Sequence, residues 1–268
     1  MGKRIPYSGD VGGARSTASC GSAAQGRLEP RPCKPGKARQ RSDNVEPTRV
    51  SPPNSTIRSF FLDGPAGRLE ALLNAGIEGA THAAVVCHPH PLYGGTLHNK
   101  VVFHTMKALN SFGFPVLRFN FRGTGLSQGE HDNGYGEVDD VCAAVEWLDR
   151  EFHLPIIFAG FSFGAAVGLR AACPDPRVEA VIGLGIPVVA GDERAYDFDF
   201  LQGCSKPKLF VSGARDQFGP RAKLEEVVAS LPEPKRLVLI DGADHFFEGR
   251  LRELREAIEV WVREVAAG

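Results

Sequence analysis

The sequence predicts an α/β protein with a mostly parallel, eight-stranded sheet and helices on both faces. Two observations predict it. Short, nearly continuous apolar runs recur along the chain, as expected for strands that are buried on both faces. Between them lie longer segments with helical periodicity, such as the three- and four-residue steps of Val138, Val141, Val145 and Leu148. Strands that alternate with helices in this way form a parallel sheet with right-handed crossovers.

The ordered domain is predicted to cover residues 56–268, after a disordered N-terminal extension at residues 1–55. The first 55 residues contain seven Gly, seven Pro and seven Ser, with one aromatic residue. Such a segment cannot bury enough apolar surface to offset its ordering entropy. Its excess of basic residues leaves an organelle presequence open as an alternative, whereas the lack of an apolar run disfavours a signal peptide.

Eight strands are expected in order along the domain. Residues 56–63 and 68–74 form an antiparallel pair, because the Gly-Pro-Ala-Gly turn at 64–67 joins them. Six buried runs follow, at residues 83–87, 115–121, 156–159, 178–184, 208–211 and 236–240. In a parallel sheet, ligands bind at the carboxyl ends of the strands, so the functional residues should lie there.

Composition excludes several classes of protein. The net charge of −1 in 268 residues gives no basic face for nucleic acid. The longest apolar stretch without charges, residues 155–169, is too short for a membrane span. The six cysteines form no disulfide framework, which suits a reducing cytoplasm. The sequence carries no signal for an oligomeric state.

A Gly-x-Ser-x-Gly motif, Gly160–Gly164, is the strongest chemical signal. It follows a buried strand and precedes a helical stretch of small residues, 165–172. A sharp turn in that position lifts a serine hydroxyl out of the sheet, and the helix directs its N-terminal N–H groups to the same point. Ser162 is therefore the predicted nucleophile.

An activated serine needs a base and an acid that orients the base. In this type of fold, the acid and then the histidine follow the serine in the chain. Asp216 and His245 each lie in the loop that follows a predicted strand, in that order. Asp241 and Asp244 are alternatives for the acid, but they are so near His245 in the loop that their side chains point away from it.

The loop Cys87–Gly95 is expected to help bind negative charge on a reacting carbonyl oxygen. One backbone N–H should come from Phe163, which follows the nucleophile, and a second from this loop. Because Pro89 and Pro91 have no N–H, the candidates are His90, Leu92 and Tyr93, and the position favours His90.

Five histidines between residues 82 and 104 raise the question of a metal site. Intervening prolines and the lack of acidic ligands nearby argue against one, and His88 is expected to bond to neighbouring backbone. The glycine-rich run Asn120–Gly129 does not match a nucleotide loop, because position 128 is Gln. Its Arg122 is expected to bind nearby carboxylates or carbonyl groups. No metal or cofactor is predicted.

Taken together, these motifs resemble the α/β-hydrolase superfamily. They are His-Pro-His-Pro from His88, the Asn-Phe-Arg-Gly run from Asn120, the Ser162 motif, Gly213-x-x-Asp216 and Gly242-Ala-Asp-His245. More narrowly, the chain looks like small, nearly lidless bacterial serine hydrolases related to dienelactone hydrolases and Xaa-Pro dipeptidyl peptidases. The resemblance implies a triad of Ser162, Asp216 and His245, with an oxyanion hole at Phe163 and His90.

The expected function is cleavage of small or medium carboxylic esters through an acyl-enzyme. A serine peptidase and a non-catalytic binding protein on the same fold are the alternatives. Only about 20 residues, 186–205, separate two strands where many esterases insert a cap, so little or no cap is expected. Tyr93, Phe161 and Tyr196 are the expected substrate contacts, although Tyr196, like Phe198 and Phe200, can equally pack on the domain.

Overall fold

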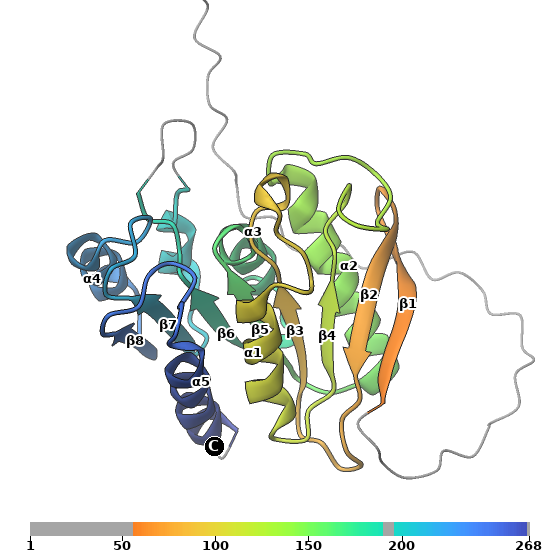
Figure 1. The fold of residues 1–268 in the computed structure, drawn as a ribbon. Coiled ribbons are helices and arrows are strands. Elements are labelled where there is room, and N and C mark those ends of the chain that lie inside the picture. Colours follow the sequence, from red (N-terminus) through yellow and green to blue (C-terminus); the bar gives the residue numbers. More distant parts are fainter. Residues whose placement is uncertain (1–55, 190–195, 267–268) are drawn as a thin grey trace, which may run out of the picture.

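An eight-stranded sheet runs through the domain in the order β1-β2-β4-β3-β5-β6-β7-β8 (Figure 1). The computed structural model describes residues 56–189 and 196–266, so the expected extension at residues 1–55 lies outside the described residues. The strands are β1 (Ile57–Gly64), β2 (Gly67–Asn74), β3 (Ala83–Cys87), β4 (Val116–Phe119), β5 (Ile156–Phe161), β6 (Val178–Leu184), β7 (Lys208–Gly213) and β8 (Lys235–Ile240).

Strands β3 to β8 all run parallel to one another, and β2 alone runs against the rest, because it is antiparallel to both of its neighbours, β1 and β4. Val85 in the middle of β3 lies opposite Leu117 on one side and Phe158 on the other. All three side chains are fully buried, which is why these strands are continuous apolar runs in the sequence. The mostly parallel eight-stranded sheet predicted from the sequence is therefore confirmed.

Three strands end two residues from the predicted position, and one of them, β7, continues to Gly213. Strand β4 stops at Phe119, because the Asn120 side chain turns aside to accept a hydrogen bond from the Leu97 amide and to donate one to Glu70. Strand β5 continues to Phe161, so the ladder with β6 extends into the Gly-x-Ser-x-Gly motif itself.

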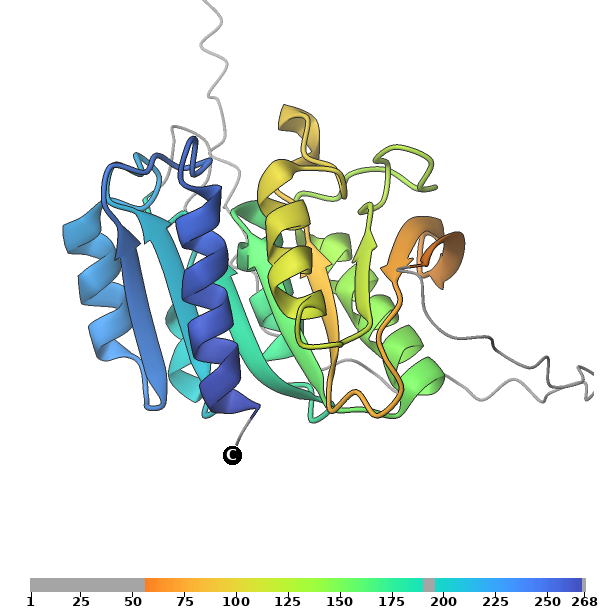
Figure 2. The same ribbon diagram turned by 60° about the horizontal axis from the view of Figure 1, so that its bottom comes forward.

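Helices cover both faces of the sheet. They are α1 (Lys100–Asn110), α2 (Tyr135–Phe152), α3 (Phe163–Ala172), α4 (Arg221–Ser230) and α5 (Leu251–Val265), with short 3₁₀ helices η1 (Pro91–Tyr93) and η2 (Asp199–Gly203). One buried cluster contains side chains of α1 and α5, and a second contains side chains of α2, α3 and α4. Figure 2 shows α1, in yellow, and α5, in dark blue, on the same face of the sheet.

The helices form because one stripe of each is apolar. In α5, the buried residues are Leu254, Ile258, Trp261 and Val262, at the spacing of one helix face. Asn99 caps α1 by accepting a hydrogen bond from the Val101 amide at 2.9 Å. No helix in the two described ranges has both the length and the apolar character needed to cross a membrane.

Candidate active site

Ser162 lies at the turn between β5 and α3, in a backbone conformation that side chains rarely adopt (φ 54°, ψ −116°). The turn is possible because both flanking glycines are in close contact with backbone. A methyl group on Gly160 would lie 2.5 Å from the Gly164 carbonyl oxygen, and one on Gly164 would collide with the His88 carbonyl oxygen. The motif therefore brings the start of α3 against the end of β3, as its sequence predicts.

His245 connects Ser162 with Asp216. Its Nε2 lies 3.0 Å from the Ser162 hydroxyl, and its Nδ1 lies 2.9 Å from Oδ2 of Asp216. Asp216 follows β7, and His245 follows β8, so three strand ends contribute one side chain each. The side chains of His245 and Asp216 are 6% and 0% exposed, so water does not compete for the bond between them.

The Asp216 carboxylate is held on both oxygens. Oδ1 accepts hydrogen bonds from the amides of Phe218 (2.8 Å) and Gly219 (3.2 Å), and the Ser212 hydroxyl lies 3.1 Å from Oδ2. Burial by itself would raise the pKa of Asp216, but the hydrogen bonds and the positive charge available on His245 outweigh burial and lower it. Asp216 is thus a carboxylate that stays ionised at the site.

Sequence reasoning missed these supporting residues. Ser212 is the penultimate residue of β7, and Phe218 and Gly219 lie in the turn after Asp216. The one available signal was the position of Ser212 at the end of a predicted strand, four residues before the predicted acid.

The alternative acids considered from the sequence, Asp244 and Asp241, do not contact His245 in this way. Asp244 caps the amides of Phe246 and Glu248, both at 3.0 Å, and Asp241 is exposed.

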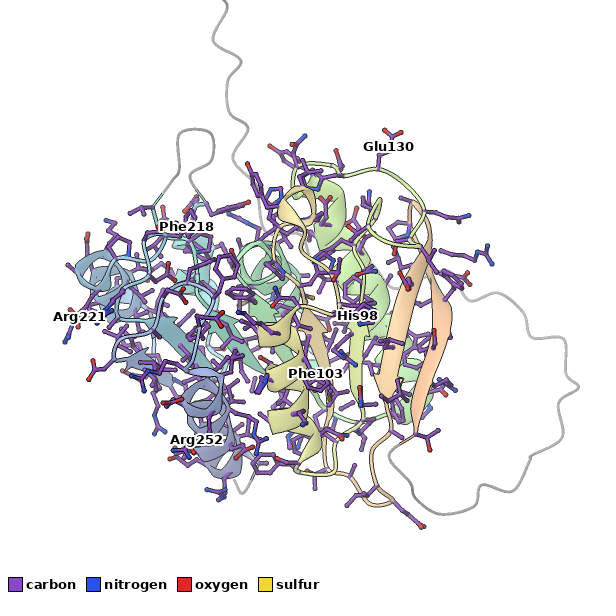
Figure 3. All side chains as sticks on the ribbon, in the orientation of Figure 1. His98, Phe103, Glu130, Phe218, Arg221 and Arg252 are labelled. Carbon is purple, nitrogen blue, oxygen red and sulfur yellow. The ribbon has the colours of Figure 1, made fainter. Side chains whose placement is uncertain are left out.

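Three phenylalanine rings surround the imidazole of His245. The ring centroids of Phe218, Phe161 and Phe246 lie 4.7, 5.1 and 5.2 Å from that of His245. Figure 3 shows Phe218 at the upper edge of the sheet, where the carboxyl ends of the strands lie. These contacts fix the plane of the imidazole between its two hydrogen-bond partners.

The loop after β3 is tied to the end of β4 by His88. Its Nδ1 donates to the Pro89 carbonyl at 2.7 Å, and its Nε2 accepts from the Phe121 amide at 3.0 Å. Burial is the main reason why the pKa of His88 falls to about 4, which keeps the ring neutral. Both ring nitrogens therefore form hydrogen bonds with backbone groups, as expected.

Within the described residues, no three His, Cys, Asp or Glu side chains gather as metal ligands would.

The next histidine in this loop, His90, lies beside the start of α3. Its ring centroid is 4.8 Å from that of Phe163, the first residue of the helix. The Leu92 amide donates to His90 Nδ1, and the Tyr93 amide donates to the His90 carbonyl. Two of the three loop amides considered from the sequence are thus bonded within the loop itself.

A cavity of about 590 Å³ opens above Ser162 and His245. Aromatic side chains form much of its wall, among them Tyr93, Tyr196 and Phe246. No Asp, Glu, Lys or Arg occurs among the described residues that line it. Tyr93 is 80% exposed at the mouth.

Of the three expected substrate contacts, Tyr93 and Tyr196 line the cavity and Phe161 does not. Phe161 is the last residue of β5, where its side chain is fully buried and packs on His245. Phe198 is also buried and lies in the core, while Phe200 packs against that core. The side chain of Phe161 thus faces the interior because β5 continues one residue beyond Gly160.

The fold and this site together define an α/β hydrolase. A protein-family model described as "Alpha/beta hydrolase domain" matches residues 93–267. The chain belongs to the α/β-hydrolase family. It is 36% identical over 206 residues to an uncharacterized protein of Rickettsia prowazekii, covering 74% of this chain and 86% of that one.

Two solved structures are similar over most of their length. An α/β serine hydrolase homologue from Coxiella burnetii is 39% identical, with a TM-score of 0.69, over 76% of this chain and 96% of that one. A protein from Xanthomonas campestris, described as an α/β serine hydrolase without a lid, is 33% identical, with a TM-score of 0.71, over 81% and 97% of the two chains. The expected superfamily and the expected lack of a cap agree with these structures.

Proposed function

We propose that the protein is a serine hydrolase that cleaves uncharged carboxylic esters with small or medium acyl groups. The observation that carries this proposal is the hydrogen-bonded series from Ser162 through His245 to Asp216, with distances of 3.0 and 2.9 Å. A serine hydroxyl is a weak nucleophile until a base accepts its proton as it attacks. This series supplies the base and the acid that orients it.

In the proposed reaction, the Oγ of Ser162 attacks the ester carbonyl carbon while its proton passes to Nε2 of His245. The charged imidazole is stabilised by Asp216, which accepts from Nδ1–H. The proton then moves from Nε2 to the departing alcohol oxygen, and the acyl group remains on Oγ. Water repeats the same steps, releasing the carboxylic acid and returning the proton to Ser162.

The oxyanion is proposed to bind the backbone amides of Phe163 and His90. Phe163 begins α3, so its amide has no partner earlier in the helix and points with the positive end of the helix dipole. His90 is favoured by its position after the His88-Pro89 step of the loop, and its ring packs on that of Phe163, the other proposed donor, at 4.8 Å between centroids. Each such donor typically contributes about 10²–10³ in kcat.

The described lining residues, none of which is Asp, Glu, Lys or Arg, favour esters over peptides with free termini. A peptidase that binds a free N-terminus needs a carboxylate near the nucleophile, and none lies among the described lining residues. Removing a charged terminus from water without a partner of opposite charge costs roughly several kcal/mol. A volume of about 590 Å³ suits a ligand of small or medium size.

The test compares p-nitrophenyl esters of graded acyl length with aminoacyl and dipeptidyl anilides. We expect turnover of the esters, little of the anilides, and labelling of the wild type by a fluorophosphonate. Ser162→Ala should abolish labelling, while Ser111→Ala, at an exposed turn after α1, should leave it unchanged. Faster cleavage of the anilides would establish the peptidase instead, and no turnover with no labelling would establish the non-catalytic binding protein.

The cytoplasmic location stays a prediction from the sequence.

A further inference from the structure

A buried pair of side chains, His131 and Glu137, lies beside the two residues proposed to form the oxyanion hole. His131 Nδ1 is 2.8 Å from Oε1 of Glu137, and their side chains are 9% and 0% exposed. Glu137 is fixed in place, because its two oxygens accept the amides of Asp132 (2.9 Å) and Gly134 (2.8 Å) at the start of α2. The carboxylate thus provides a rigid support for the imidazole.

The rings of His131, His90 and Phe163 form a mutually packed triangle. The centroid of His131 lies 5.1 Å from that of His90 and 5.6 Å from that of Phe163, and the last two lie 4.8 Å apart. His131 does not line the cavity. It therefore packs on the two residues whose amides are proposed to bind the oxyanion without lining the cavity itself.

The two ring nitrogens of His131 have fewer hydrogen bonds than expected for a buried residue that only stabilises the fold. Nε2 of His131 is buried without a hydrogen-bond partner, and the buried Nδ1 meets the Glu137 carboxylate at 2.8 Å without hydrogen-bond alignment. A buried polar atom without a partner is costly, and such atoms in folded proteins usually have a specific reason. An apolar ring would fill the same space without this penalty, so the position of the imidazole against Glu137 requires another explanation.

We infer that His131, oriented by Glu137, is a positioning residue for the oxyanion hole. This inference rests on the proposed ester hydrolysis. Donors stabilise the transition state only when they lie at about 2.7–3.1 Å from the developing oxyanion. The His131 ring restrains the rings of His90 and Phe163, and hence the backbone that carries both donors. It acts without contact with the substrate.

The experiment separates transition-state binding from substrate binding. His131→Ala removes the ring, and His131→Asn removes the ring but keeps an N–H group for Glu137, which protects the fold if the first variant fails. His98→Ala, at an exposed histidine in the segment before α1, is the matched control. For each protein, kcat and KM are measured with a p-nitrophenyl ester. Affinities are measured for the product carboxylic acid and for a trifluoromethyl ketone, whose adduct with Ser162 carries an oxyanion.

We expect both His131 variants to lose about 10- to 30-fold in kcat, less than the 10²–10³ for a deleted donor. KM and the affinity for the product acid should stay within about twofold, because ground-state binding is unchanged, while ketone affinity should fall by the same factor as kcat. A folded variant with unchanged kcat, or an equal loss of ketone and product affinity, would overturn the inference alone. A wild type that neither hydrolyses the ester nor binds the ketone would overturn the proposed function and this inference with it.

Discussion

Asp216 divides its two oxygens between His245 and the backbone. Oδ2 lies 2.9 Å from His245 Nδ1, while Oδ1 accepts the amides of Phe218 and Gly219. The carboxylate can therefore receive N–H groups on both sides at once. An amide in the same place can receive them on only one side.

This arrangement predicts the effect of Asp216→Asn. The amide oxygen of Asn will face the two backbone N–H groups, so its NH₂ group will face Nδ1 of His245. The ring proton is then forced to Nε2, where it blocks transfer from Ser162, and kcat should fall by about 10⁴-fold. Steady-state kinetics with a p-nitrophenyl ester measure this loss. The control is Asp244→Asn, which keeps the oxygen that caps the Phe246 amide, so its kcat should stay within about twofold of the wild-type value. An Asp216→Asn variant whose kcat is within tenfold of the wild-type value would refute the orientation argument.

The neutral, buried His88 predicts a loss of stability in mild acid. The pKa of His88 is about 4 in the folded protein, chiefly because of burial, and about 6.5 when the chain is unfolded. Between these values, the unfolded state binds a proton that the folded state does not. The free energy of unfolding therefore falls as the pH drops from 6.5 to 4, by about 3 kcal/mol in total from this group.

Urea unfolding at a series of pH values between 7.5 and 4 measures that slope. His88→Gln should be less stable at neutral pH, because its flexible amide must be ordered to donate to Pro89 and accept from Phe121, which the rigid imidazole ring does without that entropy cost. Its stability should nevertheless depend less on pH in this window. If both proteins show the same slope, His88 is not the group responsible.

Gly164→Ala tests the contact between α3 and the end of β3. The added methyl group would collide with the carbonyl oxygens of Cys87 and His88, which belong to rigid backbone. Overpacking of this kind typically costs about 1–3 kcal/mol, and it should also separate Ser162 from the loop of His90. Thermal unfolding and fluorophosphonate labelling should both decline. The control is Gly203→Ala, where a methyl group meets no atom within 4 Å; equal effects at both positions would argue against the contact.

The buried ion pair of Arg122 and Asp140 should matter far more for stability than an exposed pair. Their side chains are 10% and 0% exposed, with a distance of 2.8 Å between Nη2 and Oδ1. Asp140→Ala leaves the guanidinium buried without its partner and should lower the free energy of unfolding by about 3–5 kcal/mol. Glu225→Ala breaks a surface pair with Arg221 and should cost about 0.3–0.5 kcal/mol. Chemical denaturation of the two variants distinguishes them, and similar losses would contradict the role of burial.

The sequence predicts those features whose signals are local. The continuous apolar runs place β3, β5 and β7 to within two residues, since burial on both faces leaves no polar position. Ser162, Asp216 and His245 could be found because each lies in the loop or turn that follows such a run. Their convergence follows from the common direction of parallel strands.

Features that depend on packing between distant segments could not be predicted. Phe161 was expected to contact substrate, but the extension of β5 turns its side chain into the core beside His245. His131 gave no sign of its place beside His90, because 41 positions separate them in the chain. Glu137 is recognisable from the sequence only as an acidic residue in the first turn of a helix.

The sheet order β4-β3-β5 divides the site between two continuous stretches of the chain. Every residue of the proposed proton path comes after β5 begins, whereas His90, His131 and Glu137 all come before it. A single exchange of genetic material in the short connection at His153–Pro155 would therefore transfer the oxyanion-binding loop without altering the order Ser162, Asp216, His245. Chimeras between family members joined at this point should combine the nucleophile system of one parent with the charge-stabilising loop of the other.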